Sequence, residues 1–201
     1  MIRLRNALAI ATVGCAIAAP VALAATINGT SGPDTLIGTS SGDTINALAG
    51  NDSVWGQAGG DNIIAGDGDD IVNGDGKCMS GVSSSDYCDA GERSDDGGDN
   101  ISGGDGNDRL SGQGGADNIS GGNQADTIDG GSGSDNLSGN DGADTVTGGT
   151  GADNISGGNG NDTIYARDGV KDSISCGDGI DTVDADKIDS ISRDCEQVTK
   201  H

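Results

Sequence analysis

The sequence predicts an all-β fold, a parallel β-solenoid of stacked nine-residue repeats with two repeats in each turn. An aspartate recurs every nine residues in two runs, an aliphatic residue follows two positions after each of them, and glycines crowd the five positions before it. Such a fixed short period is typical of proteins whose repeats stack. The thirteen periodic aspartates are Asp34, Asp43, Asp52, Asp61, Asp70, Asp99, Asp108, Asp117, Asp126, Asp135, Asp144, Asp153 and Asp162.

Each repeat carries the signals of one short strand and one turn. With the aspartate at position six, position eight is always Leu, Ile or Val, while positions seven and nine are mostly polar. This alternation predicts a half-buried strand over positions seven to nine. Glycine fills position one in ten of the thirteen repeats and position four in eleven, which predicts a turn before each strand. Two repeats, or eighteen residues, are expected to close one turn, with parallel strands stacked on two walls.

The composition is strongly acidic and poor in aromatic residues. Among 201 residues there are 39 glycines, no Phe, and a formal net charge of −23. Aspartate supplies 31 of the 33 acidic residues, and short carboxylates among glycines suit ligand-bearing turns better than a merely solvated surface. We expect no binding to nucleic acid or to an anionic membrane surface, because such a negative chain is repelled by both.

The predicted coil brings the aspartates of alternate repeats together along its two edges. Neighbours on one edge lie about 4.8 Å apart, which is the spacing of parallel strands. A ladder of carboxylates at that spacing repels itself unless a cation lies between the rungs, and the chain has only ten basic residues. Aspartate and carbonyl oxygens select hard cations. Calcium fits best because it accepts six to eight oxygens in flexible geometry, so we expect several Ca²⁺ ions, with Mg²⁺ as the weaker candidate.

The pattern Gly-Gly-x-Gly-x-Asp-x-aliphatic-x, most complete over 103–111, resembles the RTX, or hemolysin-type, calcium-binding nonapeptide repeat. The resemblance covers Gly29 to Asn73 and about Ser94 to Tyr165. It implies a parallel β-roll with Ca²⁺ bound between turns by the position-six aspartates and turn carbonyls, helped by Asp or Asn at positions three and five. The helpers it implies are Asp67, Asp69, Asp105, Asn107, Asn123, Asn159 and Asn161. The early repeats depart from the pattern at Pro33, Ser41, Leu48 and Ala49.

Residues 1–24 have the features of a secretory signal peptide. Arg3 and Arg5 precede an apolar stretch, and Ala22-Leu23-Ala24 is a small-residue cleavage signature. An uncleaved membrane anchor is the alternative, but Pro20 and the alanine-rich, weakly apolar content argue against it. We expect cleavage after Ala24 and a secreted, extracellular protein.

The rest of the chain divides into two repeat blocks, 25–73 and 94–165, an inserted loop at 74–93, and a capping segment at 166–201. Four cysteines remain after cleavage, and four cysteines allow three pairings. Export favours disulfides. We expect Cys78–Cys88 and Cys176–Cys195, since each pair lies within one non-repeat segment. A zinc site is the weaker alternative, because there is no Cys-x-x-Cys and the single histidine is His201.

These features favour a secreted calcium-binding protein whose folding is driven by Ca²⁺. The alternative is a calcium-dependent adhesin or a cell-surface or matrix binding protein, with an unidentified glycan or protein as partner. A carboxylate-based hydrolase is a more distant possibility. We expect no enzyme, because the chain has no Gly-x-Ser-x-Gly, no His-Glu-x-x-His and no catalytic histidine. A flexible linker would have no reason to repeat an aliphatic residue in one phase.

Overall fold

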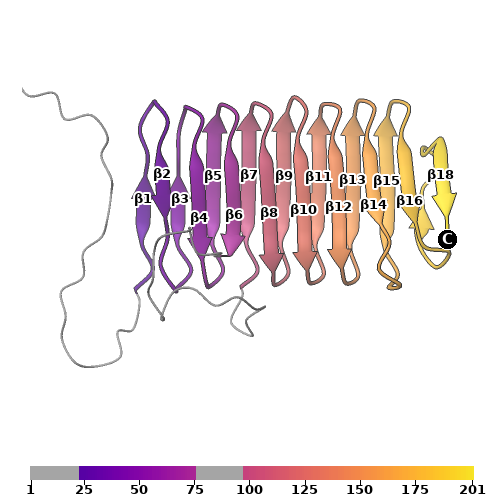
Figure 1. The fold of residues 1–201 in the computed structure, drawn as a ribbon, viewed down its shortest axis with the longest axis horizontal. Coiled ribbons are helices and arrows are strands. Elements are labelled where there is room, and N and C mark those ends of the chain that lie inside the picture. The colour runs from indigo at the N-terminus through magenta and orange to yellow at the C-terminus, as the bar shows by residue number, and fades with distance from the viewer. Residues whose placement is uncertain (1–22, 76–96) are drawn as a thin grey trace, which may run out of the picture.

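The computed structural model describes residues 23–75 and 97–201, which form one long coil of parallel strands (Figure 1). Within these ranges there are eighteen strands and no helix, so no helix that could cross a membrane. Odd-numbered strands form one nine-stranded sheet and even-numbered strands form the other. The all-β, parallel β-solenoid prediction is confirmed.

The odd sheet consists of β1 (Thr26–Asn28), β3 (Thr44–Asn46), β5 (Asn62–Asp67), β7 (Asn100–Asp105), β9 (Asn118–Asn123), β11 (Asn136–Asp141), β13 (Asn154–Asn159), β15 (Ser173–Asp178) and β17 (Ser190–Ile191). The even sheet consists of β2 (Thr35–Ile37), β4 (Ser53–Gln57), β6 (Ile71–Asp75), β8 (Arg109–Gly114), β10 (Thr127–Ser132), β12 (Thr145–Thr150), β14 (Thr163–Ala166), β16 (Thr182–Ala185) and β18 (Gln197–Lys200).

The register confirms that two repeats make one turn. Thr127 pairs with Thr145, and Asn118 pairs with Asn136, so in the central repeats each residue lies beside the residue eighteen positions further on. Most central strands are six residues long and run from position seven of one repeat to position three of the next. They are longer than the three residues predicted, because the glycines at positions one and two extend the strand before the turn bends away.

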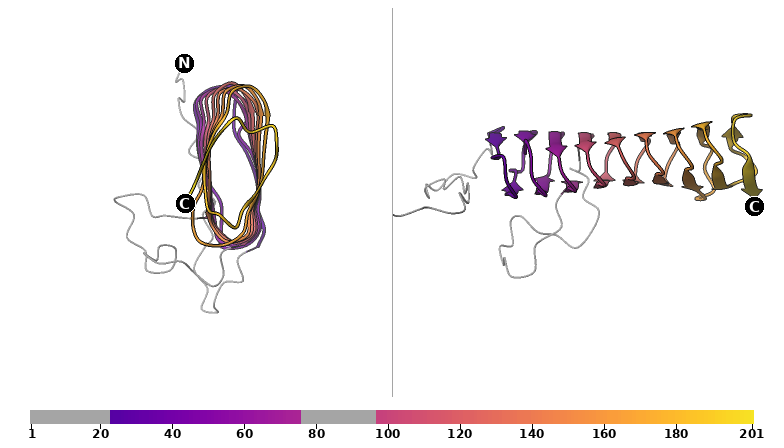
Figure 2. Two further views of the ribbon diagram at one scale, coloured as in Figure 1. Left: turned by 90° about the vertical axis from the view of Figure 1, so that its right-hand side faces the viewer. Right: turned by 90° about the horizontal axis from the view of Figure 1, so that it is seen from above.

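The core consists of two rows of aliphatic side chains, one from each sheet, packed between the sheets. Every position-eight residue from Leu36 to Ile164 is buried, and Ile174 and Val183 continue the rows. Viewed along the coil, the turns overlay as one flattened loop (Figure 2). Because side chains alternate in direction along a strand, positions six and one face the interior together with position eight. This places the repeated aspartates inside the coil.

The insertion after the first repeat block leaves the register of the coil intact. Ile71 pairs with Arg109, and Asn62 pairs with Asn100, across 38 residues, which is one turn of eighteen plus an excess of twenty. Asp75 is the last residue of β6, so the coil extends two residues beyond the start expected for the loop at 74. The predicted Cys78–Cys88 disulfide lies outside the described residues.

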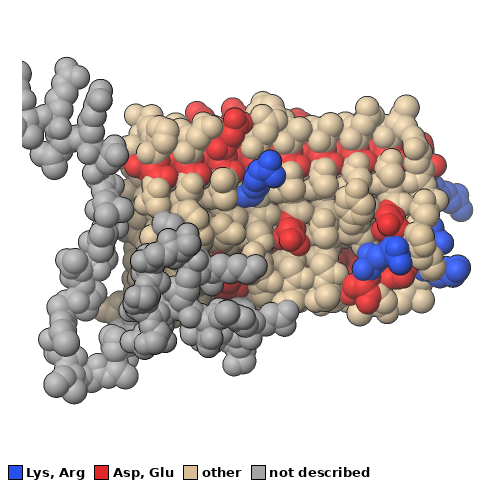
Figure 3. Space-filling model, viewed as in Figure 1, with Lys and Arg blue, Asp and Glu red and all other residues tan. Residues whose placement is uncertain are grey.

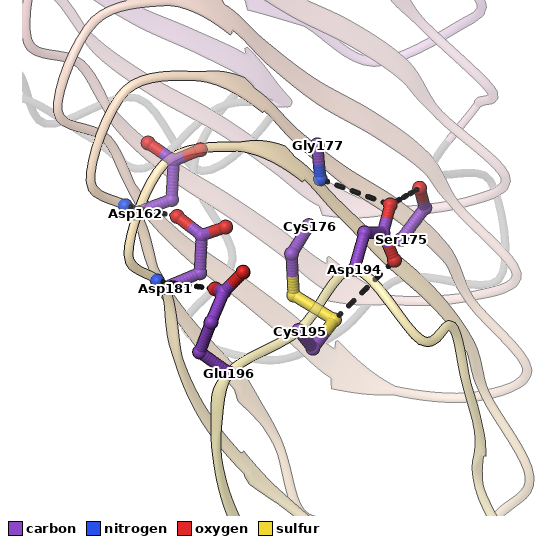
Figure 4. The surroundings of a disulfide bond; sticks show 8 residues. All are labelled: Asp162, Ser175, Cys176, Gly177, Asp181, Asp194, Cys195 and Glu196. Atoms are coloured by element: carbon purple, nitrogen blue, oxygen red, sulfur yellow. Dashed lines mark hydrogen bonds between the residues drawn. A yellow bond between two sulfur atoms is a disulfide. The ribbon is translucent and has the colours of Figure 1, made fainter.

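The coil continues past residue 165, where we placed the start of the capping segment. Strands β15 and β16 extend the two sheets, and β17 and β18 end them. The predicted Cys176–Cys195 disulfide is confirmed, with a Cα–Cα distance of 5.1 Å (Figure 4). Cys176 fills an inward-facing position one and is fully buried. The bond therefore fastens the last turn to the end of the core.

Candidate metal sites

The position-six aspartates form two continuous ladders inside the coil. In each ladder, the backbone N–H of one aspartate donates to Oδ1 of the aspartate one turn further on; the Asp108 N–H donates to Asp126 Oδ1 at 2.8 Å. The Asp43 ladder contains Asp43, Asp61, Asp99, Asp117, Asp135, Asp153, Asp172 and Asp189. The Asp34 ladder contains Asp34, Asp52, Asp70, Asp108, Asp126, Asp144, Asp162 and Asp181, and ends on Glu196.

Three ladder aspartates lie beyond the sequence-predicted set. Asp172, Asp181 and Asp189 are buried and continue the ladders into the segment that we expected to be the cap. Each is followed two residues later by Ile or Val, as in the repeats. The spacing signal fails there because Asp162 to Asp172 is ten residues and Asp181 to Asp189 is eight. The remaining sequence signal for these three residues is an aspartate followed two positions later by an aliphatic residue.

In most rungs, the second carboxylate oxygen lies buried with no hydrogen-bond donor from residues 23–75 and 97–201. A buried carboxylate oxygen without a donor is costly, and most such groups in proteins have a partner. A repeated set of them therefore indicates a missing positive or donating group. Buried Oδ2 atoms of this kind belong to Asp52, Asp61, Asp70, Asp99, Asp108, Asp126, Asp135, Asp144, Asp153, Asp162 and Asp181.

The position-one glycines leave space beside these oxygens. A Cβ atom on Gly103 would lie 2.3 Å from Asp108 Oδ2 and 2.4 Å from the carbonyl oxygen of Gly121 in the next turn. Gly112 and Gly139 have the same surroundings in their own turns. Glycine is therefore required by the close approach of a carboxylate oxygen and a carbonyl oxygen from successive turns. Carboxylate and carbonyl oxygens are the ligands that calcium prefers, so the donor set fits this ion.

Burial raises the pKa values of several carboxylates in the middle of the ladders. It raises the pKa of Asp99 to about 8, although the Asp61 backbone N–H lowers it; the carboxylates of Asp75, Asp61 and Asp117 raise it further. Burial likewise raises the pKa values of Asp61 and Asp126 to about 7, again opposed by a backbone hydrogen bond and supported by neighbouring carboxylates. At neutral pH, the carboxylates of Asp61, Asp99 and Asp126 are therefore stabilised inside the coil either by protonation or by a bound cation.

The first rung of each ladder is different. Asp34 Oδ2 accepts the Thr30 N–H at 2.5 Å, and Asp43 Oδ2 accepts the Thr39 N–H at 2.5 Å. The Thr39 hydroxyl also donates to Asp43 Oδ1 at 3.1 Å. These two carboxylates are satisfied by protein donors in the early repeats that depart from the sequence pattern. Asp34 and Asp43 are therefore weaker candidates for metal ligands than the later rungs.

The predicted helpers at positions three and five lie on the outside of the coil. Asp67, Asp69, Asp105, Asn107, Asn123, Asn159 and Asn161 are all exposed. They bond to neighbours there: Asn107 donates to Asp69 Oδ1, and Asn123 Nδ2 donates to Asp105 Oδ1 at 2.6 Å. The structure does not bring them to the interior side where the Oδ2 atoms lie, and their role as ligands stays a prediction.

No three His, Cys, Asp or Glu side chains converge on one point in the described parts of the chain. Metal ligands in addition to the ladder carboxylates would therefore come from backbone carbonyls. Figure 3 shows acidic side chains in a row along the coil and most of the basic ones at its C-terminal end, with one basic side chain nearer the middle. Positive charge from the protein thus lies away from most of the ladder.

Comparison with known proteins agrees with this geometry. No curated protein matches the chain. The RTX calcium-binding nonapeptide repeat matches in four copies, at residues 28–63, 49–76, 94–128 and 138–170, which together cover more than half of the chain. The matched copies contain most rungs of the two ladders; Asp135, Asp172, Asp181 and Asp189 lie outside them. The chain belongs to the RTX calcium-binding nonapeptide repeat family.

Proposed function

We propose that this protein is a secreted calcium-binding β-roll whose folding at neutral pH is driven by Ca²⁺. The observation that carries the proposal is the repeated buried Oδ2 atom that has no hydrogen-bond donor among the described residues, as in Asp52, Asp108 and Asp162. Stacked carboxylates repel one another, and a bound ion supplies the positive charge that offsets this repulsion. Membership of a calcium-binding repeat family supports the choice of ion.

The ladder residues are the groups that would hold the ions. Their Oδ2 atoms face the carbonyl oxygens of position one in the following turn, as Asp108 faces the carbonyl oxygen of Gly121 across Gly103. Arg109 is the single Lys or Arg within 25–75 and 97–162, so these stretches themselves offer one basic side chain against the ladder carboxylates. The thin aliphatic core and the buried charge together make the metal-free coil unstable at neutral pH.

Secretion is supported by two features. The leader ends in Ala22-Leu23-Ala24, a signature of cleavage during export. The Cys176–Cys195 disulfide is typical of proteins that mature in an oxidising compartment. Extracellular fluid also supplies calcium at the concentrations that weak extracellular modules require, which are on the order of 10⁻⁴–10⁻³ M.

A second candidate function is calcium-dependent adhesion to a neutral polar partner such as a glycan. The outer face of the odd sheet carries an asparagine ladder in which Asn118 donates to Asn100 at 3.2 Å and Asn136 donates to Asn118 at 3.1 Å. Serines at position nine of the same strands form a second polar row beside it. This uncharged, regular face lies on an otherwise acidic molecule. Glycan-array binding with calcium and with chelator tests it, and binding only with calcium is expected.

Equilibrium dialysis with radioactive calcium tests the proposed calcium sites directly. We expect several bound ions per chain, weak competition from equimolar Mg²⁺, and weaker calcium binding in Asp108→Asn. Asp129→Asn is the matched control, since Asp129 lies exposed on the outer face of β10 and is not among the predicted ligands. Equal losses in both variants, or equal competition by Mg²⁺, would contradict the assignment of ladder carboxylates as calcium ligands.

A further inference from the structure

We propose that cleavage between Ala24 and Ala25 creates an α-ammonium group that pairs with the buried carboxylate of Asp43 and so completes the first rung of the Asp43 ladder. The evidence is a contact at the N-terminal edge of the coil. The Ala25 backbone nitrogen donates to Asp43 Oδ1 at 2.6 Å. Ala25 is the residue that the predicted cleavage would make the first of the mature chain.

Ala25 occupies the position that an aspartate takes in every later turn of this ladder. The pairing of Thr26 with Thr44 places Ala25 beside Asp43. The Ala25 carbonyl accepts the Thr44 N–H at 2.9 Å, just as the Asp43 carbonyl accepts the Asn62 N–H at 2.9 Å. Alanine has no carboxylate to offer a preceding turn, so the ladder ends at this residue.

Hydrolysis changes the charge of this contact. Water adds across the Ala24–Ala25 peptide bond; Ala24 gains a carboxylate, and the neutral amide nitrogen of Ala25 becomes a positively charged ammonium at neutral pH. Asp43 is only 3% exposed, and a hydrogen bond between charged groups is roughly twice as strong as one between neutral groups. No Lys or Arg occurs within 25–75, so this ammonium would be the single formal positive charge of that block apart from bound metal.

The scissile bond lies where a peptidase can reach it. Leu23 is 80% exposed and Ala24 is exposed, whereas Ala25 is half-buried at the start of the coil. The boundary between accessible chain and ordered coil therefore coincides with the predicted cleavage site. Cleavage one residue earlier would carry the ammonium away from Asp43, and cleavage one residue later would remove the donor.

This inference stands apart from the calcium proposal. Both oxygens of Asp43 already have protein donors, from Ala25 and Thr39, so the ion pair needs no metal. If the coil proves to fold without calcium, the Ala25 ammonium is still expected to pair with Asp43. If that pairing fails, the calcium sites proposed for the later rungs are unaffected.

Two mature chains that differ by one alanine test the proposal. One begins at Ala25 and the other at Ala24, both released from a removable tag by a protease that leaves no extra residue. In saturating calcium, we expect the Ala25 chain to melt about 2–4 °C higher. The gain should disappear in Asp43→Asn and persist in the control Asp34→Asn, whose carboxylate lies at the same edge and bonds to Thr30.

A chemical measurement covers the case in which Asp43→Asn does not fold. We expect the α-amine of the Ala25 chain to react several-fold more slowly with an amine-modifying reagent than the α-amine of the Ala24 chain. Sequencing of the exported protein should give Ala25 as its first residue. Equal melting temperatures and equal reactivities, or a mature chain that starts elsewhere, would overturn the proposal.

Discussion

Replacing Gly103 by alanine should destabilise the calcium-bound coil, because the added methyl group enters the space between two turns. It would lie 2.3 Å from Asp108 Oδ2 and 2.4 Å from the Gly121 carbonyl oxygen, far inside van der Waals contact. The Gly121 carbonyl belongs to the backbone and cannot rotate away, and the Asp108 side chain is held because its Oδ1 accepts the Asp70 N–H at 2.8 Å. Overpacking of this kind costs about 1–3 kcal/mol. The smaller unfolded-state entropy of alanine returns about 0.4–1 kcal/mol, so we expect a net loss of about 1–2 kcal/mol.

Urea unfolding in saturating calcium measures this loss, and a calcium titration should show that Gly103→Ala needs more calcium to fold. Gly32→Ala is the matched control, since no atom lies within 4 Å of a Cβ at Gly32. We expect the control to be unchanged or stabilised by about 0.4–1 kcal/mol. The reasoning is refuted if Gly103→Ala is as stable as the parent or if Gly32→Ala loses as much.

Two further predictions concern pH and the disulfide. Burial raises the pKa values of Asp61 and Asp126 to about 7 and of Asp99 to about 8, from 3.8, so the folded metal-free coil binds more protons than the unfolded chain. The stability of the metal-free coil should therefore be greatest below about pH 4 and should fall as pH rises through 6 to 8. Circular dichroism in chelator measures the β structure at each pH. An increase in β structure with rising pH would contradict the prediction. Replacing both Cys176 and Cys195 by serine opens a loop of sequence separation 19 and should lower the free energy of unfolding by about 3 kcal/mol. Urea unfolding in saturating calcium measures this loss. An unchanged free energy of unfolding would show that the disulfide does not stabilise the coil.

Much of the fold follows from the nine-residue period. Two repeats per turn, parallel strands on two walls and the excess of twenty residues at the insertion were all readable from the spacing of Asp61, Asp70, Asp99 and Asp108. The longer strands were not, because the glycines at positions one and two gave only a turn signal. The backbone at positions one and two still pairs with its neighbours, as β7 runs to Asp105. The bend begins at position two, where Gly104 has a φ of 119°.

The site was predictable in part. Side chains alternate along a strand, so an aspartate two residues before a buried aliphatic faces inward with it. Asp105 shares the parity of Ile101 and Gly103 in β7, yet it is exposed, because the chain turns at Gly104 and Gly106, where φ is positive; strand alternation therefore did not predict that Asp105 and Asn107 lie outside. The hydrogen bond from one aspartate N–H to the next Oδ1, which in most rungs leaves Oδ2 without a donor among the described residues, depends on atomic geometry and has no sequence signal. The ladder residues after Asp162 were missed because the period slips by one residue there.

The most direct test of the central claim is circular dichroism of the mature chain at neutral pH, in chelator and through a calcium titration. Burial of so many carboxylates around a thin core predicts a largely disordered chain in chelator. Calcium at sub-millimolar to millimolar concentrations should convert it cooperatively to β structure. A chain with the same β spectrum in chelator and in calcium would contradict the claim that calcium drives the folding of this coil.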